Sequence, residues 1–248
     1  MLITRRISFL QSIQKAASNG YFYYTAGRVS VKKFPAFFKK INEAYQPNQP
    51  RHHNYRKKQK GEARVKFFCY PDEYDPSGLN IFFVIMVTGG THIVHELEPL
   101  QDLRVRKSRL RFSDYVLVQK PGSLTHRFTF KLSEEAYSFY LAKLRQAVRS
   151  KSKSNIAQIV KNMSNLSGFS GVRQQKKQLR KHYQGELKKS FGLTLSHEWP
   201  DILNLYARQF KVDCVKNVNL FCKKVVAFQQ SAIQVIAHYH KNQTRRDS

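Results

Sequence analysis

The chain has 248 residues, and its 44 Lys and Arg residues outnumber its 16 Asp and Glu residues, for a formal net charge of +28. A hydrophobic content of 41% suffices to build a core, which excludes a chain that is disordered throughout. So large an excess of positive charge repels itself, and it predicts a polyanionic partner such as nucleic acid rather than a membrane surface.

Residues 1–19 combine apolar and basic side chains, and the first carboxylate of the chain is Glu43. The spacing of Ile7, Leu10 and Ile13 predicts a short amphipathic helix or extension. Such a helix either docks on the core or serves as a mitochondrial targeting segment, and the composition is compatible with both interpretations.

The segment that follows predicts a strand, a helix and then a basic loop. Residues 20–25 are mostly aromatic, which favours a strand, whereas phenylalanines recur at helical spacing over 32–45. Prolines and like charges over 46–61 disfavour packing, so we interpret this stretch as a loop. Either it is merely solvated, or its cations grip phosphates when it orders on a nucleic acid. The phosphate contacts expected in it are Arg56, Lys57 and Lys58.

Residues 64–70 alternate with a period of two, which predicts a strand with two unlike faces. One face is apolar. The other combines cations with aromatic rings, as phosphate pairing and base stacking require. We therefore expect this second face to bind nucleic acid. Arg64 and Lys66 would pair with phosphates, while Phe68 and Tyr70 would stack on bases.

A cationic strip and a hairpin follow. Pro121-Gly122 suits the turn between strands at 115–120 and 124–131, because Pro presets φ and Gly accepts a positive φ. Ser133 is a favourable N-cap for a helix over 134–149. The strip residues expected to pair with phosphates are Arg104, Arg106, Lys107, Arg109 and Arg111.

From Ser133 onward only helical periodicity is present, and 150–154 is a polar linker. Helices are predicted at 155–166, 172–190, 197–211 and 214–241. The second has a buried stripe formed by Val172, Leu179, Tyr183 and Leu187. Its opposite side carries Arg173, Lys176, Lys177, Arg180 and Lys181. This side either enters a nucleic-acid groove or is a solvated basic face. The residues expected to extend the phosphate track are Arg173, Lys177 and Arg180.

The expected fold class is therefore α+β. An N-terminal extension occupies 1–19. An antiparallel sheet with two packed helices occupies 20–150, and a helical domain occupies 151–248.

Cysteine content and the length of the apolar runs indicate the cellular compartment. Cys69, Cys214 and Cys222 form no C-x-x-C pair, which argues against a disulfide framework or a cysteine zinc site. This favours a reducing, cytoplasmic compartment. The apolar run 79–88 is only strand-sized, so no membrane-spanning segment is predicted. Neither a P-loop nor a dinucleotide fingerprint is present, and we expect no cofactor.

A metal-dependent nuclease or nicking enzyme is the alternative function, with Asp72, Asp75, His92 and His95 as its candidates. Ile93 and Val94 favour a strand within 91–103, however, and a strand places the two histidines on opposite faces. His238-Tyr-His240 lies in a predicted helix, where residues two apart do not converge. Asp72, Glu73 and Asp75 cluster in a loop, but no Glu/Asp-x-Lys motif follows on a strand, so ordinary turn chemistry is the favoured interpretation. The sequence therefore favours a binding protein without catalytic or metal-binding residues.

Three segments carry a family likeness: 21–27 (YFYYTAG), 127–137 (RFTFKLSEEAY) and 168–175 (GFSGVRQQ). They resemble uncharacterised basic proteins carried on bacterial plasmids and integrating mobile elements, which implies a role in replication, mobilisation or transposition. Together with the charge, they predict a protein that holds DNA or RNA through a basic sheet face and flanking basic segments. A structural component of a ribonucleoprotein is a further alternative. The sequence specifies neither which nucleic acid is bound nor the oligomeric state.

Overall fold

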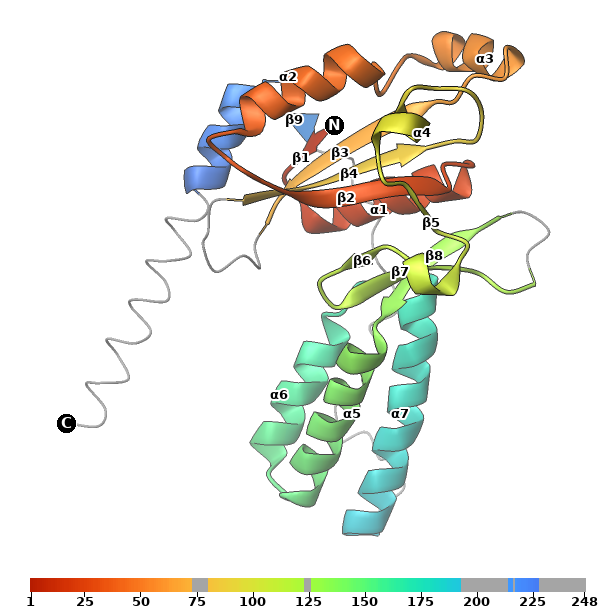
Figure 1. The fold of residues 1–248 in the computed structure, drawn as a ribbon. Helices are drawn as coiled ribbons and strands as arrows, with labels where there is room; N and C mark the ends of the chain where they lie inside the picture. The colour runs from red at the N-terminus through yellow and green to blue at the C-terminus, as the bar shows by residue number, and fades with distance from the viewer. Residues whose placement is uncertain (73–79, 123–125, 193–213, 216, 228–248) are drawn as a thin grey trace. The chain divides into compact units, whose positions relative to one another are not determined.

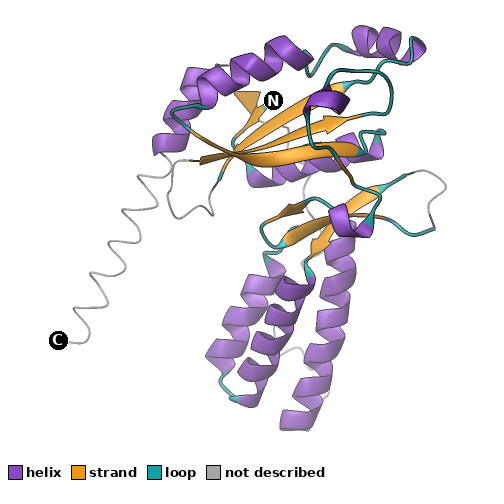
Figure 2. Ribbon diagram, viewed as in Figure 1, coloured by secondary structure: helices purple, strands orange, loops and turns teal. Residues whose placement is uncertain are grey.

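A computed structural model describes residues 1–72, 80–122, 126–192, 214–215 and 217–227. The chain divides into two compact units. The first unit comprises residues 1–102 with 211–248, and the second comprises residues 103–210. The chain combines helices with a mainly antiparallel set of strands (Figure 2), which confirms the α+β class.

A six-stranded sheet forms the centre of the first unit. Its strand order is β5 (Gln101–Asp102), β2 (Tyr23–Ser30), β4 (Asn80–Val87), β3 (Val65–Pro71), β1 (Leu2–Ile3) and β9 (Cys214–Val215). The strands pair antiparallel except for β1, which runs parallel to β3. β4 is central and buried at most positions, as its near-continuous apolar run predicts.

Helices cover both faces of this sheet (Figure 1). On one face lies α1 (Arg6–Ser18), whose Phe9 ring stacks on Tyr70 with centroids 5.2 Å apart. On the other lies α2 (Phe34–Tyr45), whose Phe38 ring is 5.6 Å from that of Phe67. Helical residues 218–227 join α2 through Phe221, 5.8 Å from Phe34. The N-terminal amphipathic segment thus docks on the core, which was one of its two predicted roles.

Two local predictions for the first unit were wrong. The basic stretch expected to be a loop contains the helix α3 (Arg51–Gln59), which starts directly after Pro50, where a proline is favourable. The expected strand around the two histidines is instead a helical turn, α4 (Val94–Leu97). His92 favours that turn because its Nδ1 accepts a hydrogen bond of 3.2 Å from the backbone N–H of Val94.

In its described residues, the second unit combines a three-stranded antiparallel sheet with three α-helices. The strands are β6 (Arg111–Phe112), β7 (Tyr115–Gln119) and β8 (Phe128–Leu132), and the short 3-10 helix η1 (Arg106–Ser108) precedes them. The helices are α5 (Glu134–Arg149), α6 (Lys153–Ser164) and α7 (Ser170–Phe191). The Ser133 cap is confirmed, because its Oγ accepts a hydrogen bond of 3.1 Å from the backbone N–H of Ala136.

The division of the chain differs from the predicted boundary at residue 150. That position lies inside the second unit, between α5 and α6. Leu144 and Val148 of α5 share one buried cluster with Ile156 and Val160 of α6, so the polar linker is only a turn between packed helices. The predicted helix 197–211 lies outside the described residues. At the start of the predicted helix 214–241, the first two residues form β9 instead.

Candidate nucleic-acid interface

The small sheet of the second unit has one sealed face and a second face that is only partly covered, which is called the open face below. Tyr115, Leu117, Phe128, Phe130 and Leu132 are buried on the sealed face. Because side chains alternate along a strand, the intervening residues of β7 and β8 share the other face. There Val116 lies opposite Lys131, both partly exposed, and Val118 lies opposite Thr129, both buried.

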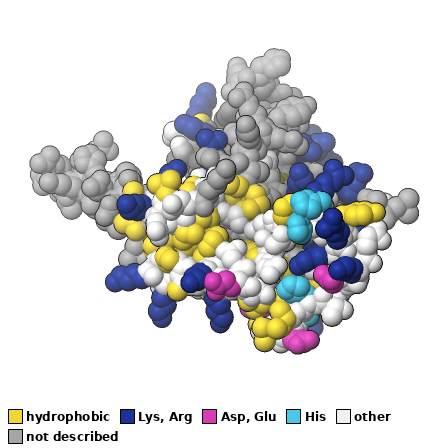
Figure 3. Space-filling view, turned by 90° about the horizontal axis from the view of Figure 1, so that it is seen from above, with side chains coloured by type: hydrophobic (Ala, Val, Ile, Leu, Met, Phe, Trp, Pro, Cys, Tyr) yellow, Lys and Arg dark blue, Asp and Glu magenta, His cyan; other side chains and the backbone are white. Residues whose placement is uncertain are grey.

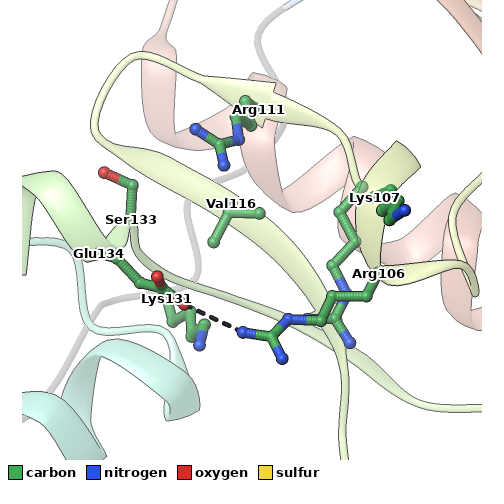
Figure 4. A pocket seen from close by; sticks show the side chains of 8 residues that line it. Arg106, Lys107, Arg111, Val116, Lys131, Ser133 and Glu134 are labelled. Atoms are coloured by element: carbon green, nitrogen blue, oxygen red, sulfur yellow. Dashed lines mark hydrogen bonds and ion pairs between the residues drawn. The ribbon is translucent and has the colours of Figure 1, made fainter.

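The first hollow on this open face is strongly cationic. It has a volume of about 600 Å³ and is called the arginine hollow below. Its lining comes from η1, the residues after it, both long strands and the start of α5. The lining residues are Arg106, Lys107, Arg109, Arg111, Val116, Lys131, Ser133 and Glu134. Figure 4 shows the cationic side chains around Val116, with Glu134 among them.

Two ion pairs offset part of this charge. Arg106 Nη2 lies 3.4 Å from Glu134 Oε1, and Arg111 Nη1 lies 3.3 Å from Glu135 Oε1. All four side chains are exposed, so water and salt screen both pairs and leave each worth little. Hydrogen bonds from its own backbone N–H and from Ser133 lower the pKa of Glu135, which therefore stays charged. Neither pair neutralises Lys107, Arg109 or Lys131.

Arg109 is the least exposed arginine of the arginine hollow. Its side chain is half-buried, and its Nε is enclosed without a hydrogen-bond partner in the described part of the chain. An enclosed donor without an acceptor is costly, and a charged donor more so. An anionic oxygen that reached this guanidinium would therefore gain from a group that has already lost its water.

A second hollow, of about 610 Å³, shares Arg109 and Lys131 with the first. It is called the glutamine hollow because Gln174, Gln175 and Gln178 of α7 line it. Residues of β7, β8 and their connecting turn complete its lining, including Gln119, Lys120 and Thr129. The two hollows together form one polar and cationic track over the open face of the sheet.

The glutamine hollow exists because α7 begins against the free edge of β8. Thr129 Oγ1 accepts hydrogen bonds from the Gly171 backbone N–H (3.2 Å) and the Ser170 hydroxyl (3.0 Å). One turn later, the Gln175 side chain accepts from Leu132 N (2.7 Å) and donates to Leu132 O (3.1 Å). These bonds satisfy edge groups that a strand at the border of a sheet would otherwise expose. Gln174 and Gln178 are left exposed at the rim.

The structure brings together only some of the predicted phosphate contacts. Four residues of the strip, Arg106, Lys107, Arg109 and Arg111, line the arginine hollow, whereas Arg104 is exposed outside it.

On α7, the phosphate track predicted at Arg173, Lys177 and Arg180 follows one stripe of the helix. These residues recur at intervals of four and three, and Gln174 and Gln178 lie about 100° further round. The three cations therefore line neither of the two hollows.

Lys176, predicted to lie on the cationic side of α7, is completely buried. Its position falls on the same stripe as Val172, Leu179 and Tyr183, which are buried as predicted. Its Nζ donates a hydrogen bond of 2.8 Å to the backbone carbonyl of Ser164. Burial disfavours the charged amine and lowers the pKa of Lys176 to about 8.

The predicted base-stacking role of Phe68 and Tyr70 was wrong. Their exposed fractions are 1% and 0%, because α1 packs on this face of β3. Arg64 and Lys66, nearer the start of the strand, are half-buried over the ring of Tyr21, at 5.3 and 5.0 Å from its centroid. Burial and the neighbouring charges of Lys15 and Arg64 lower the pKa of Lys66. The aromatic face of β3 is thus part of the core.

A separate cationic surface lies on α3 in the first unit. None of its residues is buried, and Tyr55 is 64% exposed. Arg56 and Lys58 are exposed and Lys57 is half-buried, so the predicted phosphate contacts of this segment are accessible. In Figure 3, Lys and Arg side chains crowd beside His at the end of the first unit that carries α3.

Sequence reasoning missed Lys120, Lys131, Gln174 and Gln178 as members of the track. A signal was present in the run Arg127–Leu132, where polar residues alternate with buried aromatic and apolar ones. That alternation places Lys131 and Thr129 on one face, opposite to the buried aromatic side chains. No comparable signal identifies the two glutamines, because they belong to the track only as a result of the position of α7 beside β8.

The residues of the nuclease alternative do not form a cluster. Asp72 is buried and paired with Arg28. His95 Nε2 donates to the Thr88 carbonyl at 3.1 Å, and the His92 ring contacts Tyr45. Burial, with the nearby charges of Lys57 and His95, lowers the pKa of His92. Among the described residues, no three His, Cys, Asp or Glu side chains converge as a metal site requires. The remaining candidates, Asp75 and His238-Tyr-His240, lie outside the described residues.

Comparisons of this chain with family models, curated proteins and solved structures find no match. Within the part of the chain that the structure describes, no helix has the length and apolar character needed to cross a bilayer.

Proposed function

We propose that this protein binds nucleic acid through the open face of the small sheet in the second unit. The observation that carries the proposal is the arginine hollow. Among the described residues that line it, a single carboxylate accompanies five cations, namely Arg106, Lys107, Arg109, Arg111 and Lys131. These cations come from separate stretches of the chain, so their charges lie close together only in the folded protein.

The chemistry of the hollow suits phosphate groups. Arginine offers a planar fork of donors that matches phosphate oxygens, and lysine adds a point charge. Val116 is the only apolar residue among the described residues that line it, so these residues do not form the mainly apolar walls of a typical small-molecule pocket. Neutralising a chain of phosphates also releases counterions, which gives affinity without reading any base.

The exposed helix α3 supports the same function from the first unit. A helix with no buried residue and a dense set of like charges gains little from packing and loses from repulsion. A polyanion would remove that repulsion. We therefore propose Arg56, Lys57 and Lys58 as a second set of phosphate contacts, independent of the arginine hollow.

The test begins with protein purified at high salt, so that any nucleic acid acquired during expression is removed. Binding to random-sequence duplex DNA and single-stranded RNA is then measured across a series of salt concentrations. We expect log Kd to rise linearly with log salt, with a slope of about 0.9 for each phosphate neutralised on duplex DNA. Affinity that is absent, or independent of salt, would overturn the proposal.

A charge-matched pair of variants locates the surface. Replacing Arg106, Lys107 and Arg109 together with Gln should weaken binding to all sequences and lower the salt slope by roughly 2–3. The control replaces Lys153, Lys161 and Lys188 with Gln, which removes the same charge from exposed sites on α6 and α7. Equal losses in both variants would mean that only net charge matters, and the arginine hollow would not be the site.

A further inference from the structure

Beside the arginine hollow, two amide side chains make no hydrogen bond within the described part of the chain. Gln174 and Gln178 lie one turn apart on α7, are exposed, and have no hydrogen-bond partner in the described part of the chain. Their neighbour Gln175 differs, because both of its amide atoms are bonded to Leu132. The free pair therefore presents donors and acceptors to the glutamine hollow.

The two hollows offer different chemistry along one track. The arginine hollow has cationic donors, which suit phosphates and do not distinguish sequences. The glutamine hollow adds amides, each with a donor and an acceptor on one planar group, and its volume of about 610 Å³ has room for a nucleobase. An amide can bond the N6 and N7 positions of adenine simultaneously, which is the usual basis of adenine recognition by glutamine.

The geometry points to Gln174 and Gln178 as base-reading residues that favour adenine, next to the phosphate contacts of the arginine hollow. Arg109 and Lys131 line both hollows, and they hold the backbone while the amides meet the base edge. This inference rests on the proposed nucleic-acid binding and adds sequence preference to it.

The experiment selects binders from a randomised library, offered both as duplex DNA and as single-stranded RNA, on the full-length protein. The wild type is expected to enrich a motif with adenine at a fixed position. The variant Gln174→Ala with Gln178→Ala should keep its salt-dependent affinity for the unselected library within about twofold. Its preference for the motif over the library should fall about tenfold or more.

Gln146→Ala is the matched control, since Gln146 is exposed on α5 and lines neither hollow. It should retain the motif preference. Alanine is at least as favourable as glutamine in a helix, so all three substitutions leave α5 and α7 intact, which circular dichroism checks.

The outcomes separate this inference from the proposed function. Salt-dependent binding by the wild type without an enriched motif overturns base reading and leaves nucleic-acid binding standing. Retention of the motif by the double glutamine variant overturns the assignment to these two residues. Failure of the wild type to bind either library overturns the proposed function and base reading together.

Discussion

Two strands of this molecule combine cations with aromatic rings, and they end with opposite roles. In β3, Arg64 and Lys66 share a face with Phe68 and Tyr70, and α1 seals the aromatic part of that face. In β8, Lys131 lies on the face opposite to its buried phenylalanines and stays accessible. When cations and rings share a face, burying the rings also draws the cations toward the core. When they lie on opposite faces, burying the rings leaves the cations open.

The largest expected effect tests the aromatic face of β3 that α1 covers. Phe68→Ala should lower the free energy of unfolding by about 3–5 kcal/mol, because a fully buried ring is replaced by a cavity. Denaturant titration measures this loss. The milder Phe68→Leu keeps enough stability for binding assays, and its affinity for nucleic acid should equal that of the wild type. A tenfold loss of affinity in that variant would show that the β3 face contacts the ligand after all.

The next effect concerns the contact of α7 with β8, which creates the glutamine hollow. A Cβ at Gly171 would lie 2.5 Å from the Phe130 carbonyl oxygen, so Gly171→Ala must push α7 away from β8. We expect a loss of about 1–3 kcal/mol in unfolding free energy, as in overpacked cores. Gly185→Ala on the same helix meets nothing within 4 Å and should be neutral or stabilising by up to about 1 kcal/mol. Equal changes in unfolding free energy for the two variants would contradict the close approach of α7 to β8 at Gly171.

Lys176 extends the comparison of covered and accessible cations to a lysine that is buried inside the second unit. Its pKa of about 8 lies below the ordinary 10.5, so between these pH values the unfolded chain holds a proton that the folded chain has released. Stability therefore rises with pH in this window, by at most about 1.4 kcal/mol per pH unit. Relative to Lys176→Met, the wild type should gain stability from pH 8 to pH 10 in denaturant titrations. A pH-independent difference would mean that the amine is solvated.

The smallest expected effect concerns the open face itself. Lys131→Gln should weaken binding about fivefold at low salt and lower the salt slope by roughly 1, while unfolding free energy changes by less than about 0.5 kcal/mol. Lys161→Gln, at an exposed position on α6, is the matched control and should leave the salt slope unchanged. If Lys131→Gln lowered the unfolding free energy without weakening nucleic-acid binding, Lys131 would have a role in packing and not in binding.

Much of the local structure was predictable from the sequence. The alternation over β3, the Ser133 cap and the apolar stripe of α7 each depend on residues close together in the chain. The candidate site was predictable only in part: the strip from Arg106 to Arg111 was identified, whereas Lys131 and the glutamines of α7 were not. The role in a mobile element stays a prediction.

The sequence by itself determined the excess of positive charge, the α+β class and most of the helices and strands, because these follow from composition and short-range periodicity. Only the tertiary structure decided which faces are open. It packed α1 over Phe68 and Tyr70, joined α5 and α6 across the expected boundary, and sealed Lys176 while leaving Lys131 accessible. The reason is that exposure depends on which distant segment covers a face, and alternation along one strand contains no information about that partner.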